Sequence, residues 1–466
     1  MAKFFRRFLA LIVSIAACPA FVACTNGYVK DGGFGYVGGP EYHAADKIVG
    51  GGDGRTGLAE GVEPIDEGTE APKDNEPVRP AGLITASAWN DNIYYEYFLK
   101  LFDEAVYEEI EADDSSSDVQ NSESGEKTGE TEKRLITPEG RFYHFYDHDR
   151  WGFDTANRVT VKVTDGETPV IGAKIKYYGK DQREFYSVTD ARGVAYLFPE
   201  TEDGAITVTS GVNVATSSFT AENREITVDM SAGAQKEALI KLMFVVDVTG
   251  SMGDELSYLT NELADVINRV VKDNANVKID LAFLFYRDDG DREKFAYYDF
   301  MRVTESQNLN VQLKNLAKQR ADGGGDYPEA LDEALEMAVE KNWGEENSTK
   351  IIFNIYDAPP HEKDSNKACY ERAVRRAAEK GIRINPVLCS GAGLLCEYLA
   401  RHAAIYTGGH FVYVTDDSGI GNSHYDPDIP NAVVERLNDL MVRLIDGYYT
   451  GEFASPVSWK DVDQNG

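Results

Sequence analysis

The chain has 466 residues, of which 42% are hydrophobic, enough to fill the cores of two or three domains. Its 79 Asp and Glu residues outnumber its 47 Lys and Arg residues, giving a formal net charge of -32. An acidic surface of this kind repels phosphate backbones, so nucleic acid is excluded as the expected partner.

Residues 1–24 have the pattern of an export signal. Lys3, Arg6 and Arg7 precede an apolar run shorter than the ~20 residues that a membrane-spanning helix needs. "FVAC" at 21–24 resembles the lipobox of bacterial lipoproteins, which implies lipidation of Cys24 and a lipid anchor in the cell membrane or outer envelope. "IAAC", ending at Cys18, is a second match, but a proline follows it. An ordinary cleaved signal is the alternative.

The next two segments differ in their content of apolar residues. Residues 25–80 are rich in glycine and are predicted to form a flexible linker. Residues 81–156 are predicted to contain a short helix from about Tyr94 to Ile110, which docks on a neighbour. The acidic stretch at 111–133 has almost no large apolar side chain and predicts a solvated linker.

Residues 157–232 alternate apolar and polar side chains, with turn signals at "DGETP" and "DARG". Period-2 alternation over short segments predicts a small antiparallel β-sandwich. The stretch "PVIGAKIKYYG…TDARGVAYLF" resembles transthyretin-type, carboxypeptidase-regulatory-like sandwiches, which implies a structural spacer.

Strands and helices alternate over residues 238–450, and residues 451–466 form a tail. "MFVV" and "IIFNI" are apolar on both faces, which is typical of strands inside a parallel sheet covered by helices. The chain is therefore predicted to be multidomain, with a doubly wound α/β domain after the sandwich. The predicted helices span 252–273, 305–319, 328–341, 365–380, 393–405 and 430–447. Ligands of such folds bind at the carboxyl ends of the strands.

Oxygen-bearing side chains follow two of these strands. Asp247, Thr249 and Ser251 lie in one turn after "LMFVV", and Asp357 follows "IIFNIY". Hard cations such as Mg²⁺ prefer a few oxygen ligands and retained water, so the pattern predicts a metal site. Helix capping by single aspartates is the alternative.

The loop resembles the metal-ion-dependent adhesion site of von Willebrand factor type A domains, where an Asp-x-Ser-x-Ser loop is completed by a threonine and an aspartate from two other loops. The resemblance implies that Thr249 replaces the first serine and that Asp357 holds metal-bound water. Gly325 falls at the threonine position, so Asp326 is expected to supply the missing oxygen, with Asp322 as second choice. "YRDDGD", "GGGDYPEAL" and "DAPPH" are similar to a bacterial branch of this family.

Other polar residues receive structural interpretations. "YRDDGD" at 286–291 is predicted to be a hairpin turn, with a second cation site as the alternative, and His361 is predicted to be a loop residue. Cys389 and Cys396 either form a disulfide or remain buried thiols, and Cys369 lies on a helix.

The sequence thus predicts a lipid-anchored envelope protein that binds a protein ligand. The ligand is expected to offer a carboxylate to a bound Mg²⁺, with Mn²⁺ and Ca²⁺ as alternatives. A scaffold or assembly factor for an envelope complex is the second hypothesis. A metal-dependent hydrolase is disfavoured because neither a nucleophile motif nor a metalloprotease motif is present, so the chain is predicted not to be an enzyme.

Overall fold

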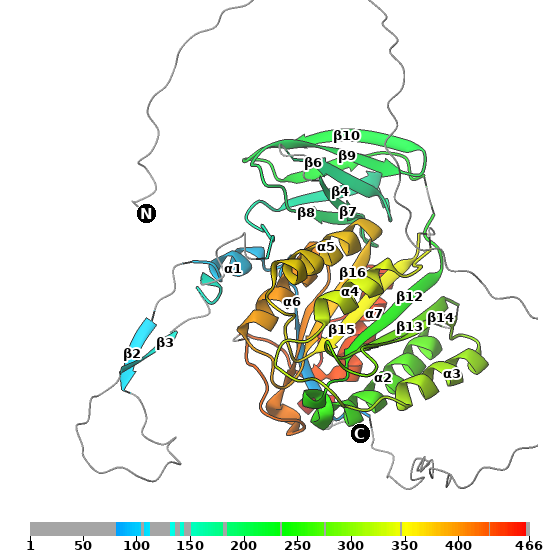
Figure 1. Ribbon diagram of the computed structural model, residues 1–466. Helices are drawn as coiled ribbons and strands as arrows, with labels where there is room; N and C mark the ends of the chain where they lie inside the picture. Colours follow the sequence, from blue (N-terminus) through cyan, green and yellow to red (C-terminus); the bar gives the residue numbers. More distant parts are fainter. Residues whose placement is uncertain are drawn as a thin grey trace, which may run out of the picture. The chain divides into compact units, whose positions relative to one another are not determined.

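The computed structural model describes residues 81–103, 107–111, 131–135, 140–143, 151–179, 184–233, 235–274, 276–344, 347–427 and 429–462 (Figure 1). The predicted signal, Cys18, Cys24, the linker at 25–80 and most of the acidic stretch lie outside these residues. Within the described ranges, no helix is both long enough and apolar enough to cross a bilayer.

The main sheet has eight strands in the order β14-β13-β12-β15-β16-β17-β1-β18. Five neighbouring strands, from β13 to β17 in that order, are parallel, whereas β14 and β1 run antiparallel to their partners. All nine residues of β12 are buried, as the apolar run predicts. The strand bounds are β12 Leu239–Asp247, β13 Lys278–Tyr286, β14 Phe295–Arg302, β15 Thr349–Tyr356, β16 Ile382–Leu388, β17 Phe411–Thr415, β1 Thr85–Trp89 and β18 Glu435–Arg436.

Helices cover both faces of this sheet, which confirms the predicted mixed α/β fold (Figure 1). On one face lie α4 (Leu331–Glu340), α5 (Asp364–Lys380) and α6 (Leu394–Thr407). On the other lie α2 (Gly253–Asp273), α3 (Ser306–Ala317) and α7 (Leu437–Thr450). Helix α2 buries residues at helical spacing, among them Leu259, Leu263 and Val266. Three further short helices are η3 (Gly250–Met252), η4 (Asp416–Ser418) and α8 (Trp459–Val462).

Two helices begin later than predicted. Helix α4 starts at Leu331 rather than 328, because Glu329 and Pro360 form an isolated β-bridge just before it. Helix α7 starts at Leu437 rather than 430, because Glu435 and Arg436 are used as strand β18, which pairs with β1. In both cases pairing with a distant segment replaces the first helical turn.

Strand β1 was not predicted, and it belongs to the main sheet, where it pairs with β17. The segment before it is held by Glu262 of α2, whose carboxylate accepts backbone N–H groups from residues 82, 83 and 84 at 2.8, 2.7 and 3.1 Å. Beyond the strand, Asp91 accepts two hydrogen bonds from Arg401 at 3.1 and 2.7 Å, with both side chains fully buried. Residues 82–91 are therefore structurally part of the α/β unit.

The helix predicted at 94–110 is shorter. Helix α1 spans Tyr95–Lys100, and residues Tyr107–Glu111 form strand β2, which pairs with β3 (Thr131–Leu135). The prediction of helix as far as Ile110 was wrong because pairing with β3, which local periodicity does not reveal, overrides the helical pattern.

The sandwich comprises two small sheets, with strand orders β10-β9-β6-β7 and β11-β4-β5, and β8 also pairs with β4. It is not wholly antiparallel, since β11 runs parallel to β4. Alternate residues of its strands are buried, as the period-2 pattern predicts. The bounds are β4 Val159–Asp165, β5 Thr168–Pro169, β6 Lys174–Tyr178, β7 Glu184–Val188, β8 Val194–Leu197, β9 Gly204–Ser210, β10 Asn213–Phe219 and β11 Glu225–Asp229.

The sandwich and the α/β unit share one hydrophobic core. The rings of Phe198 and Tyr406 stack with centroids 4.7 Å apart, and Phe185 lies 5.3 Å from the same tyrosine ring. The Tyr406 hydroxyl also donates to the carbonyl of Asp154 at 2.8 Å. The sandwich is therefore packed against α5 and α6 rather than joined only by a linker.

Candidate metal centre

The loop after β12 places its polar side chains against one another. The Thr249 hydroxyl and backbone N–H both donate to Oδ1 of Asp247, at 2.7 and 2.9 Å, and the hydroxyls of Thr249 and Ser251 are 3.1 Å apart. Asp247 and Thr249 are fully buried, whereas Ser251 is exposed. The three predicted side chains therefore come together, with an opening to solvent at the serine.

Asp357 comes from the neighbouring strand. It directly follows β15, which pairs in parallel with β12, so both aspartates lie at the same sheet edge. Both carboxylate oxygens of Asp357 and Oδ2 of Asp247 are buried without a hydrogen bond of normal geometry among the described residues. Buried polar atoms are rarely left unsatisfied. Three such oxygens on adjacent strands point to a ligand that this chain does not itself provide.

The two aspartates resist ionisation. Burial raises the pKa of Asp247 to about 7, the nearby charge of Asp357 adds to the rise, and the Thr249 hydrogen bonds oppose it. Burial also raises the pKa of Asp357 to about 6, partly opposed by the Ser251 hydroxyl. A divalent cation would favour the charged form of both groups.

The donor set suits a hard cation. Within the described part of the chain, no three His, Cys, Asp or Glu side chains converge closely enough to hold a metal on their own. Asp247 and Asp357 are only two acids, and the hydroxyls of Thr249 and Ser251 provide the further oxygens. Magnesium is commonly held by one or two carboxylates plus retained water. The residues therefore fit Mg²⁺ better than they fit zinc.

The glycine-rich loop at 321–326 contacts the β12 loop, but the side chains of its two predicted ligands are exposed. The backbone N–H of Gly250 donates to the carbonyl of Gly323 at 3.1 Å, which joins the two loops. Asp326 and Asp322 are both exposed. The structure thus brings together Asp247, Thr249, Ser251 and Asp357, and it leaves Asp326 at the surface nearby; the role of Asp326 in metal binding stays a prediction.

Glu329 is a buried acid that the sequence interpretation did not single out. It is 3% exposed, and its Oε2 atom has no hydrogen-bond partner among the described residues. A Cβ atom added at Gly324, which has a φ of +74°, would lie 2.8 Å from Oε1 of Glu329 and 3.2 Å from Cβ of Thr249. Burial raises the pKa of Glu329 to about 9, and the charges of Asp247, Asp288 and Asp357 add to this effect. Glycine at 324 therefore lets a carboxyl group lie close to the predicted metal loop.

A second polar group, also not predicted, surrounds the start of α2. The His424 ring bonds to Oε1 of Glu255 at 2.5 Å and to Oδ1 of Asp416 at 2.7 Å. Burial alone would lower the pKa of His424, but these two carboxylates outweigh it and raise the pKa. Asp254 accepts two hydrogen bonds from Asn422, at 2.7 and 2.6 Å. These contacts hold the loop after β17 against the first turn of α2, next to Ser251.

The "YRDDGD" stretch forms the turn between the antiparallel strands β13 and β14. Oδ2 of Asp291 accepts backbone N–H groups from Asp288 at 3.1 Å and from Gly324 at 3.0 Å. His361 bonds to Asp288 at 3.1 Å. These contacts favour the hairpin-turn interpretation, because the acidic side chains fasten the turn to the glycine-rich loop and to the loop after β15.

The cysteines of the α/β unit are Cys369, Cys389 and Cys396, and the structure holds them as free, buried thiols. Burial raises the pKa of Cys396 to about 12, so this thiol is uncharged at neutral pH. Of the two alternatives for Cys389 and Cys396, the structure shows the thiols.

Comparison with known proteins identifies this region. The family model for the von Willebrand factor A domain matches residues 241–395, from β12 to the start of α6. Residues 241–395 are a von Willebrand factor A domain. This segment of the A domain contains all four side chains that converge at the sheet edge, together with Glu329 and Asp326. The wider range of 238–450 and the other predicted domain limits stay predictions.

The sequence relatives share only part of their length with this chain. One is a putative ariadne-like RING finger protein of Acanthamoeba polyphaga mimivirus, 33% identical over 138 residues, which are 30% of this chain and 13% of the relative. Another is the alpha-protein kinase vwkA of Dictyostelium discoideum, 26% identical over 140 residues, which are 30% of this chain and 21% of the relative. The chain spans about a fifth or less of these proteins, so nothing about their activities transfers to it.

Similar solved structures are remote. The open conformation of the pilus adhesin SpaC from Lactobacillus rhamnosus GG has a TM-score of 0.34 and 10% identity, over 61% of this chain and 35% of that chain. An aerotolerance-related membrane protein from Bacteroides fragilis has a TM-score of 0.24 and 14% identity, over 48% and 97%. These values are too low to support an inference about function.

Proposed function

We propose that this protein is an exported, lipid-anchored component of the cell envelope whose A domain binds a protein ligand through a divalent cation. The cation-dependent part of the proposal rests on one observation: three buried carboxylate oxygens of Asp247 and Asp357 lack hydrogen bonds of normal geometry beside the hydroxyls of Thr249 and Ser251. Leaving such atoms unsatisfied is costly, and a cation would satisfy them together.

Each residue has a distinct proposed role. Asp247, Thr249 and Ser251 would hold Mg²⁺, with Mn²⁺ and Ca²⁺ as alternatives, and Asp357 would orient its bound water. The second loop would supply one more oxygen, from Asp326 or from Glu329. Because Ser251 is exposed, the cation would keep a position open to a carboxylate of the partner protein. An oxygen-only set of this kind supports binding rather than zinc-dependent hydrolysis.

Metal binding is testable by unfolding. At a free Mg²⁺ concentration a hundred times the dissociation constant, the cation should stabilise the protein by about 2.7 kcal/mol if the unfolded chain does not bind it. Asp247→Ala should abolish this increment. Asp273→Ala is the matched control, since this exposed aspartate ends α2, about 30 Å along the helix from the metal loop. No change in wild-type melting with Mg²⁺, Mn²⁺ or Ca²⁺ after chelation would refute the metal site.

The lipid anchor needs a separate test, because Cys24 lies outside the described residues. Cys24→Ser should abolish incorporation of a labelled fatty acid and release the protein from membranes. Loss of label only in Cys18→Ser would move the anchor to that cysteine. Persistence of membrane attachment with no label in the wild type would refute lipidation.

A further inference from the structure

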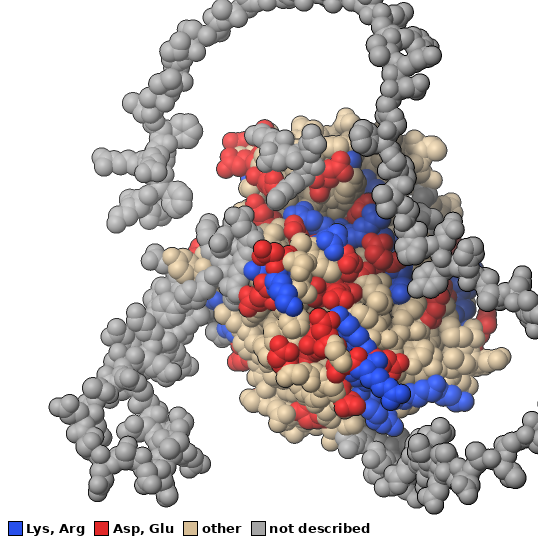
Figure 2. All heavy atoms as spheres, in the orientation of Figure 1, with Lys and Arg blue, Asp and Glu red and all other residues tan. Residues whose placement is uncertain are grey.

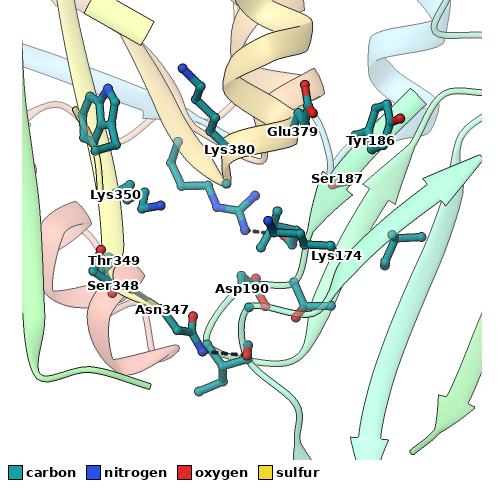
Figure 3. Close-up of a pocket in the computed structure, with 18 of the residues that line it drawn as sticks. Lys174, Tyr186, Ser187, Asp190, Asn347, Ser348, Thr349, Lys350, Glu379 and Lys380 are labelled. Carbon is teal, nitrogen blue, oxygen red and sulfur yellow. Dashed lines mark hydrogen bonds between the residues drawn. The ribbon is translucent and has the colours of Figure 1, made fainter. Parts of the chain in front are cut away.

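A cleft of about 850 Å³ lies between the sandwich and the A domain, at the edge of the main sheet opposite the metal site (Figure 3). One wall is formed by β6, β7 and β9 of the sandwich. The other is formed by the residues after α4, the start of β15 and the end of α5. The eight residues of β15 separate this cleft from Asp357, a distance of about 26 Å. The cleft is therefore distinct from the proposed metal centre.

The charge of the cleft is opposite to that of the whole protein. Eight of its lining residues are Lys or Arg and two are acidic, whereas the chain has a formal net charge of -32. Figure 2 shows Lys and Arg side chains gathered where the sandwich borders α5, among abundant Asp and Glu. In a basic cleft with low-dielectric walls, the positive potential is concentrated. Such a cleft attracts anionic ligands even though the rest of the surface is acidic. The cations are Lys174, Lys176, Lys236, Lys341, Lys350, Arg376, Lys380 and Arg383.

Lys174 and Arg383 are among the cleft cations that have no acidic partner within ion-pair distance among the described residues. Lys174 is exposed on β6, at the cleft. Arg383 is 8% exposed, and its guanidinium donates to two backbone carbonyls, those of Thr407 and Val188, at 2.7 Å each. A buried guanidinium without a carboxylate bears a desolvation cost that a bound anion would offset. By contrast, Lys176 is paired with Glu184 at 2.7 Å.

The two walls are fixed relative to each other. Besides the bond from Arg383 to Val188, Asn347 Nδ2 donates to the carbonyl of Ile171 at 2.9 Å. Gly381, with a φ of +69°, lies so close to β7 that an added Cβ would be 3.1 Å from Cβ of Val188. A cleft held open by such contacts loses little conformational entropy when a ligand binds.

The remaining lining favours a hydroxylated ligand. The walls carry hydroxyl and amide side chains, and two tyrosine rings stand at the β6 and β7 side: Ser187, Thr207, Thr209, Ser348, Thr349, Asn342, Asn347, Tyr178 and Tyr186. Strands β6 and β9 of that wall are paired along both edges, so neither offers a free edge to an added peptide strand. The volume lies within the usual range for small-ligand sites, about 300–1,000 Å³. The concave shape does not match a bilayer surface.

We propose that this cleft binds an acidic oligosaccharide, whose carboxylate or sulfate groups contact Lys174, Lys350 and Arg383 and whose hydroxyls contact the polar walls. Figure 3 shows Lys174, Lys350 and Lys380 standing on three different elements around the space. The protein would thus carry a glycan-binding site in addition to its proposed metal-dependent site.

Calorimetric titration of the full chain tests this proposal. A tetragalacturonate or a heparin-derived tetrasaccharide should bind, neutral maltotetraose should not, and added salt should weaken binding. Lys174→Glu/Lys350→Glu should reduce affinity at least about ten-fold, because each reversal turns an attraction into a repulsion. Lys318→Glu, at the exposed residue that directly follows α3 on the other face of the sheet, is the control. A metal chelator should have no effect, which separates this site from the metal centre.

Three results would overturn the proposal. They are the absence of binding by both acidic sugars, equal affinity in the double variant and the control, and tighter binding of tetraglutamate than of either sugar. The last result would assign the cleft to acidic peptides. An unchanged melting temperature of the double variant, measured alongside, ensures that a lost affinity reports the cleft and not unfolding.

Discussion

Replacing Asp247 by Asn should stabilise the metal-free protein at pH 8, even though the residue is fully buried at the centre of the proposed site. The reason is that burial and the neighbouring Asp357 disfavour its ionised form. Asparagine has nearly the same shape and carries no charge, and its carbonyl oxygen can still accept both hydrogen bonds from Thr249. In saturating Mg²⁺ the same substitution should destabilise the protein, because it removes a ligand.

The size of the effect follows from the pKa. The pKa of Asp247 rises from 3.8 to about 7, and at about 1.4 kcal/mol per pH unit this corresponds to about 4 kcal/mol at pH 8. The new amide group would replace Oδ2, an atom with no hydrogen-bond partner of normal geometry among the described residues, and an unsatisfied amide costs about 1–3 kcal/mol. The expected net gain at pH 8 without metal is therefore about 1–3 kcal/mol.

The sign of the pH dependence gives a second check. Because its folded-state pKa is raised, Asp247 contributes a loss of stability to the metal-free wild type as pH rises from about 4 to above 7. Urea unfolding at pH 5 and pH 8, each with chelator and with Mg²⁺, measures this loss. Asp247→Asn should lessen it, and Asp273→Asn should not. If Asp247→Asn is destabilising at pH 8 in chelator as well as in Mg²⁺, the aspartate is a structural cap and the reasoning is wrong.

Three further substitutions test other parts of the structure. Glu329→Gln should weaken the stabilisation by Mg²⁺ in thermal melts, and Asp326→Ala should not, because Glu329 is buried beside the metal loop and Asp326 is exposed. The opposite result would assign the metal ligand to Asp326. Tyr406→Ala should lower the free energy of unfolding in urea by about 3–5 kcal/mol, because it removes the ring that stacks on Phe198. The control Val212→Ala, at a 93% exposed position, should leave that free energy almost unchanged. Burial lowers the pKa of His410 to about 3, so this residue alone should contribute a loss of about 3 kcal/mol of stability between pH 6.5 and pH 4. His410→Gln should remove that contribution from the pH profile of the wild type, and identical profiles for the two proteins would contradict a neutral buried histidine.

The sequence was sufficient to predict the α/β fold and the four converging side chains, because both depend on strong local signals. Strands buried on both faces are continuous apolar runs, and β12 and β15 are runs of this kind. Parallel strands also place their carboxyl ends at one edge, so a polar residue after each of two such runs has a defined location. Asp247 and Asp357 could be paired on this basis without knowing any distance.

The parts that were not predicted depend on contacts between distant segments. Strand β1, "TASAW", has weak hydrophobicity, and its partner β17 lies more than 300 residues further along the chain. The carboxylate that holds the preceding segment, on Glu262, occupies an ordinary position of a long helix. His424 likewise lies in a polar loop, and only the fold brings Glu255 to its ring. None of these residues has neighbours in the sequence that indicate its partner.

Glu329 shows why residue type and spacing were not enough even inside a recognised motif. An acid just before a helix is ordinarily a solvated group that interacts with the helix dipole, and α4 begins two residues later. Here residue 324 is a glycine, and a side chain at this position would meet both Thr249 and Glu329. The carboxyl group of Glu329 occupies the space that such a side chain would need. Burial then raises the pKa of Glu329 to about 9, so its carboxyl group is protonated at neutral pH in the metal-free protein. It becomes a charged ligand only if a cation displaces the proton.

Uptake of Mg²⁺ by the wild type should therefore release protons at pH 7, and Glu329→Gln should release fewer. Calorimetry in two buffers of different ionisation enthalpy measures this number, and equal proton release by both proteins would place Glu329 outside the metal site.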